Sequence, residues 1–329
     1  MINIICEIAN GYYGNLKISK KYVDIAASAK SDAIKFQVAY PEDVLLSTDK
    51  LFKVLKKNEM SLSHWKVLKN YAKKKKIKFY LDIDGEKAFN LAKKIKPDAL
   101  KISTTSFFDK KLLNKCLNSF KKVYISVSGV KEEEVHRLYL YLKLKKKLKK
   151  ITFLFGHQNV PTKIENTNLS RLVNFKKRYK NVEIGFMDHI DGSSQYKYSL
   201  SVFALGLGVN CFEKHLTISR KKKLIDFTSA LEGDEFKSYV KTLNDHKKSL
   251  GKNNKELTKS EKKYRYGALT ILFSKSKIKK NQKITYNNVT HKRPLKLSRQ
   301  HIFDPDKVIG KISKSEININ EPLKLKELK

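Results

Sequence analysis

The sequence predicts an α/β protein, a (β/α)8 TIM barrel followed by a small, mostly β domain, and three observations support this fold class. Eight short strand-like runs alternate with helical segments up to about residue 250. The runs are apolar on both faces, which is typical of parallel strands covered by helices. Beyond residue 264 the helical pattern gives way to short strand-like pieces and turns. A doubly wound open sheet is the alternative that the alternation leaves open.

Residues 1–250 are assigned to the barrel, and its predicted elements follow one another in order. The strand-like runs are 2–8, 33–38, 77–81, 99–103, 123–126, 151–155, 182–186 and 209–215. Helical spacing of apolar residues marks the intervening segments 17–29, 62–75, 86–94, 132–148, 169–178 and 196–205. Eight such units in about 250 residues match the size of one (β/α)8 barrel.

The remaining residues predict a linker and a second domain. Residues 251–264 are polar and rich in lysine and asparagine, which is typical of a linker. Residues 265–329 hold strand-like pieces at 268–274, 282–285, 289–292 and 308–312, with turn signals between them. A domain of this size seldom has a large core, so we expect it to pack on the barrel or on a second subunit.

The net charge of +39 raises the question of nucleic-acid binding. All but seven of the 71 basic residues are lysines, and they lie on the polar faces of nearly every predicted helix rather than along one stripe. We therefore expect no specific nucleic-acid partner, and only weak binding to polyanions at low salt.

The sequence also bears on the compartment in which the chain works. No stretch approaches the roughly 20 apolar residues of a membrane span, and the N-terminus reads as a strand rather than a signal peptide. Cys6, Cys116 and Cys211 are scattered and form no paired framework. We expect no membrane partner and a reduced, cytoplasmic setting.

Two histidines are the first candidate functional residues. His189 and His215 each close an apolar run, at the expected carboxyl ends of the last two strands. In a parallel barrel these ends open onto one face, where the chemistry takes place. Two imidazoles there can share one divalent metal and leave positions open for substrate and water. A core imidazole bonded to a carbonyl is the alternative for one histidine, but two at adjacent strand ends favour a metal site.

Other polar residues lie near the same strand ends. Lys35 and Lys101 belong to apolar runs, where an ammonium is costly unless it meets an anion, so both could bind a phosphate or a carboxylate. The hydroxyls of Thr104 and Ser126 could donate to phosphate oxygens. The same rim also carries Glu7, Gln37, Gln158, Glu213 and Asp226. Each side chain alone could be structural, but their shared position favours a binding site.

This ordered set of residues resembles the sialic acid synthase family. The resemblance rests on Glu7-Ile8-Ala9-Asn10, Ala33-Ile34-Lys35-Phe36-Gln37, Asp188-His189, Glu213-Lys214-His215-Leu216-Thr217 and Asp226 with Ser229-Ala230-Leu231. Residues 278–285 and Lys292-Arg293-Pro294 resemble the antifreeze-like (SAF) domain of that family. The resemblance implies a transferase that makes nonulosonic (sialic-type) acids. Such an enzyme condenses phosphoenolpyruvate with an amino-sugar aldehyde, such as N-acetylmannosamine, to give a nine-carbon 2-keto acid and phosphate.

The resemblance also implies roles for single residues. It places the metal, Mn²⁺ or Mg²⁺, on His189 and His215. The positions that match phosphoenolpyruvate contacts are Lys35, Lys101, Thr104, Ser126 and Gln158. The positions that match sugar contacts are Glu7, Gln37 and Asp226, and Glu7 and Asp226 are also candidates for moving a proton. Arg293 matches an arginine that the small domain of one subunit sends into the barrel of another, which implies a domain-swapped homodimer.

Several residues depart from the family pattern. They are Tyr12 in place of histidine, Ser106 in place of a sugar-contacting glutamate, Val160 in place of tyrosine, Met187 in place of serine and Leu295 in place of glycine. Most of these positions match residues near the sugar or in loops beside the substrate. The sequence therefore does not identify the acceptor sugar. Two alternatives also stay open: a phosphoenolpyruvate-using aldol synthase that makes a seven- or eight-carbon keto acid, and a catalytically inactive sugar-binding relative.

Overall fold

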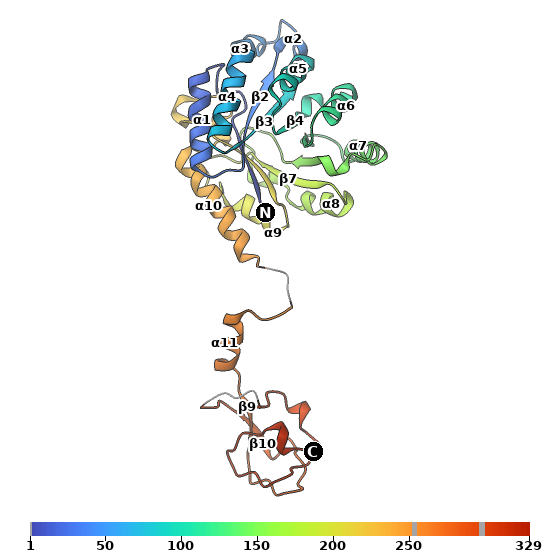
Figure 1. The fold of residues 1–329 in the computed structure, drawn as a ribbon, viewed down its shortest axis with the longest axis vertical. Helices are drawn as coiled ribbons and strands as arrows, with labels where there is room; N and C mark the ends of the chain where they lie inside the picture. Colours follow the sequence, from blue (N-terminus) through green and yellow to red (C-terminus); the bar gives the residue numbers. More distant parts are fainter. Residues whose placement is uncertain (1, 252–254, 296–299) are drawn as a thin grey trace. The chain divides into compact units, whose positions relative to one another are not determined.

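The computed structural model describes residues 2–251, 255–295 and 300–329, and the chain divides into two compact units, residues 1–251 and 252–329 (Figure 1). Each unit has a hydrophobic core of its own. None of the helices in these described ranges has the length and apolar character that crossing a membrane requires.

The first unit is a closed barrel of eight parallel strands in sequence order. The strands are β1 (Asn3–Glu7), β2 (Ala33–Ala39), β3 (Lys78–Asp84), β4 (Ala99–Ile102), β5 (Val123–Ser126), β6 (Ile151–Phe155), β7 (Glu183–Asp188) and β8 (Cys211–His215). β1 closes the barrel, because Glu7 pairs with Lys35 of β2 on one side and with His215 of β8 on the other. The predicted (β/α)8 barrel is confirmed, and the open sheet is excluded.

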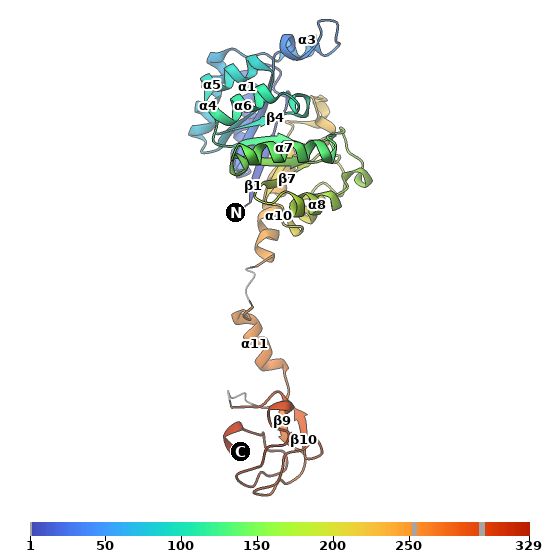
Figure 2. The same ribbon diagram turned by 90° about the vertical axis from the view of Figure 1, so that its right-hand side faces the viewer.

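Helices surround the barrel, as the two perpendicular views show (Figures 1 and 2). They are α1 (Leu16–Ser28), α2 (Pro41–Val44), α3 (Phe52–Lys57), α4 (Leu62–Lys74), α5 (Glu86–Ile95), α6 (Lys110–Ser119), α7 (Glu132–Leu144), α8 (Ser170–Arg178), α9 (Ser199–Gly206) and α10 (Gly233–Ser249). Side chains fix some of the helix starts: Ser61 caps α4 by accepting from the His64 amide, and Asp109 caps α6 by accepting from the Leu112 amide.

The predicted elements of the barrel differ from the observed ones in a few places. The predicted helix 132–148 ends at Leu144, because Lys146 adopts a left-handed φ of 53°. Helices α2, α3, α6 and α10 match none of the predicted segments, although α10 buries Phe236, Val240 and Leu243 at helical spacing. The other predicted barrel elements begin and end within three residues of the observed bounds.

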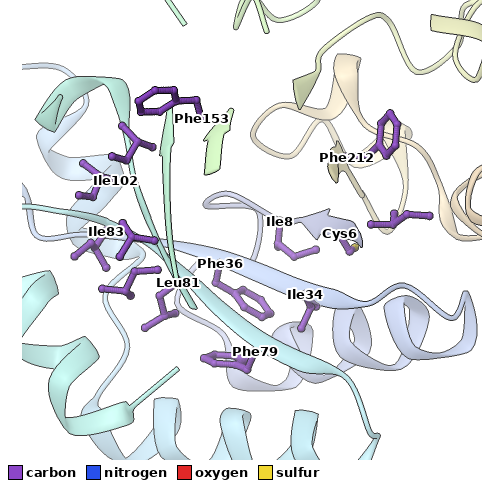
Figure 3. Close-up of a cluster of buried hydrophobic side chains, with 14 of the residues drawn as sticks. Cys6, Ile8, Ile34, Phe36, Phe79, Leu81, Ile83, Ile102, Phe153 and Phe212 are labelled. Carbon is purple, nitrogen blue, oxygen red and sulfur yellow. The ribbon is translucent and has the colours of Figure 1, made fainter. Parts of the chain in front are cut away.

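The barrel strands pack apolar side chains on both faces. On their outer faces, side chains such as Phe36 and Phe79 pack toward the helices, where Trp65 of α4 meets Phe36 with ring centroids 6.0 Å apart (Figure 3). The inner faces form a separate apolar cluster of Ile5, Ala33, Tyr80, Ala99, Tyr124, Leu154, Met187 and Cys211. Because side chains alternate along a strand, residues two positions further on also point inward, at the carboxyl ends.

The second unit is built mainly of short β pieces. It contains α11 (Lys259–Ala268) and an antiparallel pair, β9 (Ile271–Ser274) with β10 (Val289–Lys292). The predicted pieces 282–285 and 308–312 are joined by an isolated bridge between Lys283 and Ile312 rather than by a named pair of strands. Its core is Leu272, Ile278, Ile284, Val289, Ile302, Val308, Ile317, Leu323 and Leu328.

Helix α11 was not predicted, because residues 251–264 were expected to form a linker and the residues after them short strand-like pieces. It begins inside the predicted linker and ends in the predicted second domain. Its start is a capping box, in which Thr258 accepts from the Glu261 amide and Glu261 accepts from the Thr258 amide. The capping box can be read from the sequence. The helix after it is rich in lysine and has few apolar residues at helical spacing, so the segment resembles a linker.

Candidate active site

A pocket of about 210 Å³ opens at the carboxyl ends of the barrel strands. Glu7 ends β1 and His215 ends β8, and the two are neighbours where the barrel closes. The predicted site residues that line the pocket are Glu7, Gln37, Lys101, Thr104, Gln158, His189, His215 and Asp226. The structure therefore brings most of the predicted residues together on one face of the barrel.

Three predicted residues lie elsewhere. Lys35 is fully buried inside the barrel. Ser126 stands behind the pocket wall, where its Oγ lies 2.7 Å from Oγ1 of Thr104. Arg293 belongs to the second unit, where its Nε donates to the carbonyl oxygen of Gly267 over 3.0 Å.

His189 and His215 form a close pair at the ends of β7 and β8. Their ring centroids are 4.6 Å apart, and the two side chains are 6% and 5% exposed. Burial lowers the pKa of His189 to about 3 and that of His215 well below its usual value. Both imidazoles are therefore neutral near pH 7, which is the form that binds a metal.

The histidine pair fits a shared divalent ion. Both ring nitrogens of His189 are buried and find no hydrogen-bond partner within the described ranges, which is unusual for buried polar atoms and leaves their lone pairs or protons unused. Oδ2 of Asp226 lies 4.0 Å from Nδ1 of His215. Across those same ranges no group of three or more histidine, cysteine or acidic side chains is placed to hold a metal, so substrate or water would have to complete the coordination.

Five charged side chains fill the inside of the barrel next to the pocket. Nζ of Lys35 pairs with Glu7, lies 2.9 Å from Oε2 of Glu213 and 3.5 Å from Oδ2 of Asp82. Nζ of Lys101 lies 2.8 Å from Oε1 of Glu213 and 3.0 Å from Oδ2 of Asp82. Three carboxylates thus share two ammonium groups, and this buried cluster lacks one positive charge.

A proton on Glu7 would supply the missing charge. Burial raises the pKa of Glu7 to about 7, an effect that Lys35 opposes and Glu213 reinforces. Burial also acts on Glu213, but Lys101 and Lys35 outweigh it and lower the pKa of that carboxyl. Glu7 is therefore the group in this cluster that gains or loses a proton near neutral pH.

The sequence predicted that Lys35 and Lys101 could bind a phosphate or carboxylate of a ligand. In the structure both ammonium groups pair with carboxylates of the protein itself. Lys35 has no exposed surface and lies among three carboxylates, so a direct contact with a small ligand falls to Lys101, which lines the pocket. The physical expectation behind the prediction holds, because each buried ammonium is paired with anions.

Sequence reasoning missed Asp82 and Ser103 and gave Glu213 no role. Oγ of Ser103 donates to Oδ1 of Asp82 over 2.8 Å, and all three residues line the pocket. The predicted third strand stopped at residue 81, one position before Asp82. Extending the alternation of inward side chains from Tyr80 would have placed Asp82 inside the barrel.

A second buried ion pair stands behind the histidines. Asp188 and Lys214 directly precede them and pair on the outer face of the barrel, with Nζ 3.1 Å from Oδ1. Oδ2 of Asp188 accepts from Ser201 of α9 over 3.0 Å, and Tyr239 of α10 donates to Ser201 over 2.9 Å. These contacts tie the ends of β7 and β8 to two helices and so fix the spacing of the histidines.

Four of the five departures from the family pattern lie in the barrel, in or near the pocket, and the fifth lies in the second unit. Tyr12 is buried and donates to the backbone oxygen of Gln37 over 3.0 Å. Ser106 donates to Asp84, Val160 lines the pocket, and Met187 belongs to the inner apolar layer. Leu295 is fully exposed in the second unit.

Comparisons with known proteins find relatives along most of the chain. Residues 22–255 match the sequence model of the NeuB family. The chain is 25% identical to the pseudaminic acid synthase of Campylobacter jejuni, over 98% of this chain and 95% of that one. It is 26% identical to the N,N'-diacetyllegionaminic acid synthase of the same species, over 88% and 90% of the two chains. The structure of the N-acetylneuraminic acid synthetase of Leptospira borgpetersenii superposes with a TM-score of 0.74 at 26% identity, over 81% of this chain and 92% of that one.

Proposed function

The chain belongs to the NeuB family, and from this membership we propose that it condenses phosphoenolpyruvate with an open-chain N-acetylated amino-sugar aldehyde. The products are a nine-carbon 2-keto sugar acid and phosphate. The names of the synthases that resemble this chain along most of its length support the reaction class. The observation that carries the proposal is the pair of neutral, buried imidazoles beside Lys101 in one pocket.

His189 and His215 would hold a divalent ion, Mn²⁺ or Mg²⁺, at the pocket. When bound, such an ion supplies Lewis acidity to the acceptor aldehyde and charge stabilisation to the alkoxide that develops there. The ends of β7 and β8 hold the two imidazole rings in place. Asp226, which lies next to His215, would orient a sugar hydroxyl.

Lys101, Thr104 and Gln158 would bind phosphoenolpyruvate, with Ser126 behind the pocket wall holding the Thr104 hydroxyl in place. The ammonium of Lys101 would attract the anionic substrate, and the Thr104 hydroxyl and the Gln158 amide would supply hydrogen bonds to its oxygens. Fixing both substrates side by side can contribute several kcal/mol of the roughly 7–11 available from proximity. C3 of phosphoenolpyruvate then attacks the aldehyde carbon, water adds at C2, and cleavage of the C–O bond releases phosphate.

Glu7 and Gln37 would act on the acceptor side of the pocket. Glu7 has a pKa of about 7, so it can carry a proton to or from the reacting oxygens at neutral pH. The Gln37 amide, fixed by a 3.0 Å hydrogen bond from Nδ2 of Asn10, is placed to orient sugar hydroxyls.

The reaction is tested by measuring phosphate release from phosphoenolpyruvate with a panel of aldehydes, with and without Mn²⁺. We expect turnover with N-acetylated amino hexoses and a nine-carbon product by mass spectrometry. Turnover only with four- or five-carbon aldose phosphates would favour the synthases of seven- or eight-carbon keto acids. Sugar binding without phosphate release would favour an inactive relative.

Glu7→Gln is expected to lower kcat by about 100- to 10,000-fold, because the amide cannot carry a proton. It also changes how stability depends on pH. The folded protein holds the Glu7 proton up to about pH 7, whereas the unfolded chain releases it near pH 4.5, so the wild type loses stability as pH rises through this window. The unfolding free energy of the wild type relative to the variant should fall by about 2–3 kcal/mol between pH 5 and 8.

Urea titrations at several pH values measure this difference, and the exposed Glu133→Gln serves as the control. A difference that stays constant from pH 5 to 8 would contradict the proposed protonation of Glu7. A variant with wild-type kcat would contradict its part in the reaction.

We also propose that the second unit is a SAF-like domain that sends Arg293 into the barrel of another subunit in a domain-swapped homodimer. Arg293→Ala should then raise the KM for the amino sugar by about 10- to 100-fold, as expected for a lost charge-assisted hydrogen bond. The KM for phosphoenolpyruvate should stay close to that of the wild type and of the exposed control Lys280→Ala. An effect confined to phosphoenolpyruvate, or a monomer by light scattering, would contradict this role.

A further inference from the structure

Asp82 is a buried carboxylate at the carboxyl end of β3 to which the proposed reaction assigns no part. Its neighbours Leu81 and Ile83 point outward into the main hydrophobic core (Figure 3), so Asp82 faces the inside of the barrel. The pairing of β3 with β4 sets Asp82 directly beside Lys101. Asp82 is 4% exposed and lines the pocket at the strand ends. The register of the barrel therefore places a carboxylate next to a lysine that a ligand can reach.

Both carboxylate oxygens of Asp82 have partners. Oδ2 lies 3.0 Å from Nζ of Lys101 and 3.5 Å from Nζ of Lys35. Oδ1 accepts from Oγ of Ser103 over 2.8 Å. Burial by itself would lower the pKa of Lys101, but Asp82, followed by Glu213, outweighs burial and raises it. Asp82 is therefore a fixed anion whose nearest cationic partner is a fully charged ammonium.

Acidic side chains outnumber basic ones in the lining of the pocket. Within the described part of the chain, the lining residues that carry a carboxyl or ammonium group are Lys101, Glu7, Asp82, Glu213 and Asp226. An ammonium has three N–H donors, and the carboxylates of Asp82 and Glu213 both lie within 3.0 Å of Lys101. An anionic ligand that approaches Lys101 therefore meets a cation whose charge the protein already balances.

We propose that Asp82 is a positioning residue that holds Lys101 in place and competes with the anionic donor for its ammonium, which keeps the affinity of the pocket for the donor low. This inference rests on the proposed function, in which Lys101 binds phosphoenolpyruvate. A carboxylate or phosphate of that substrate would lie near Asp82 whenever it contacts Lys101, because the two side chains are 3.0 Å apart. Like charges that close repel one another strongly in a site with little water.

The same repulsion would act on the phosphate that the reaction releases. A lysine without a paired carboxylate would bind both the donor and this product tightly, and slow product release limits the turnover of many enzymes. Interactions that stabilise substrate and transition state equally lower KM without raising kcat. Asp82 would therefore weaken donor binding and speed the release of phosphate.

Asp82→Asn tests this role, because the amide keeps the shape of the side chain and removes its charge. Phosphoenolpyruvate binding is measured by isothermal titration calorimetry without an acceptor sugar. The titration is made at pH 8, where Glu7, with a pKa of about 7, is already ionised and cannot offset the change by releasing a proton. We expect the Kd of the variant to be at least tenfold lower than that of the wild type. In steady-state assays the KM for phosphoenolpyruvate should fall by a similar factor, whereas kcat should not rise.

The sign of the change separates competition from a purely structural role. If Asp82 only kept Lys101 in place, its loss would loosen the ammonium and weaken donor binding. A Kd that is unchanged or higher in the variant would therefore overturn the proposal. Asp82→Glu keeps the negative charge and should bind the donor as weakly as the wild type.

The Asn variant is expected to fold, because it removes one of three carboxylates that share two ammonium groups. Far-UV circular dichroism checks this. Asp82→Ser, a second uncharged variant, should show the same tighter binding and replaces the first if the amide disturbs the fold.

Two further variants assign the effect to the pair of Asp82 and Lys101. Asp84→Asn is the matched control, because Asp84 lies two residues further along β3, is 7% exposed and accepts from the hydroxyls of Thr105 and Ser106. Asp84 does not line this pocket, so donor affinity should not change. On a Lys101→Met background, Asp82→Asn should give no gain in affinity, because no ammonium is left for the donor to reach. A gain that persists there, or that Asp84→Asn reproduces, would overturn the proposal.

Titration with inorganic phosphate keeps the inference separate from the proposed reaction. A phosphate dianion needs only an accessible ammonium, so Asp82→Asn should bind it more tightly than the wild type does, whether or not any sugar is turned over. If no acceptor is used but this gain appears, the proposed function fails and the role of Asp82 beside Lys101 is supported. If the variant binds neither phosphate nor phosphoenolpyruvate more tightly than the wild type, the inference is overturned, and turnover of an N-acetylated amino hexose would still support the proposed function.

Discussion

His189→Ala is expected to lower kcat by about 1,000-fold or more and to weaken the affinity for Mn²⁺, while the barrel stays folded. The ring is buried at the end of β7, 4.6 Å from that of His215, and no residue in the described ranges bonds to its nitrogens. Removing it therefore breaks no protein hydrogen bond, and the cavity it leaves should cost less than about 3 kcal/mol. What would be lost is one of the two proposed ligands for a divalent ion, whose charge would stabilise the developing alkoxide.

The measurements are kcat with and without added Mn²⁺, Mn²⁺ affinity by calorimetry, and far-UV circular dichroism. His215→Ala should behave in the same way. The control is His246→Ala, because His246 is exposed on α10 and its ring bonds to the Thr242 backbone oxygen, away from the pocket. If the His189 variant keeps wild-type activity after chelation, or binds Mn²⁺ as tightly as the wild type, the metal assignment is wrong.

Lys35→Met is expected to lower the free energy of unfolding by about 3–5 kcal/mol at pH 8, because it leaves buried carboxylates uncompensated. Glu7, Asp82 and Glu213 would then share Lys101 alone. The loss should be smaller at pH 6, where the freed carboxylates take up protons more readily and the repulsion between them falls. An equal loss of unfolding free energy at pH 6 and pH 8 would show that the variant is destabilised by altered packing and not by unpaired charge.

Urea unfolding at pH 6 and 8 measures the effect. Lys241→Met is the control: its side chain is 80% exposed and pairs with Asp245 one turn along α10, so we expect a change below about 0.5 kcal/mol. A Lys35 variant as stable as this control would show that the buried pairs contribute little.

The fold was predictable because each barrel strand can be recognised from its own run of apolar residues, without knowledge of its neighbours in the fold. Runs such as Ile151–Phe155 are apolar on both faces, and β5 and β6 match their predicted bounds. The histidine pair was predictable for a related reason: in a closed parallel barrel, the ends of adjacent strands must lie on one face, so His189 and His215 had to be near each other.

The pairing of the charged residues was not predictable in this way. Lys35 and Glu213 are far apart in the sequence, and their contact depends on how strands across the barrel interior approach one another. Asp82 was missed because the apolar run seemed to end before it. A cavity lined by Asp43, Asp84 and Asp109 was missed because these residues come from the ends of several elements, and only the folded chain brings them together.

Strand β8 carries opposite charges on successive residues, with Glu213 facing the inside of the barrel and Lys214 facing the helices. Loss or gain of one residue there would exchange the two faces and place an ammonium beside Lys35 and Lys101. The segment between β2 and α4 is under no such constraint, because it lies outside the barrel ladder. Insertions or deletions in that segment leave the register of the barrel strands unchanged, whereas β8 can diverge only through substitutions that keep its length.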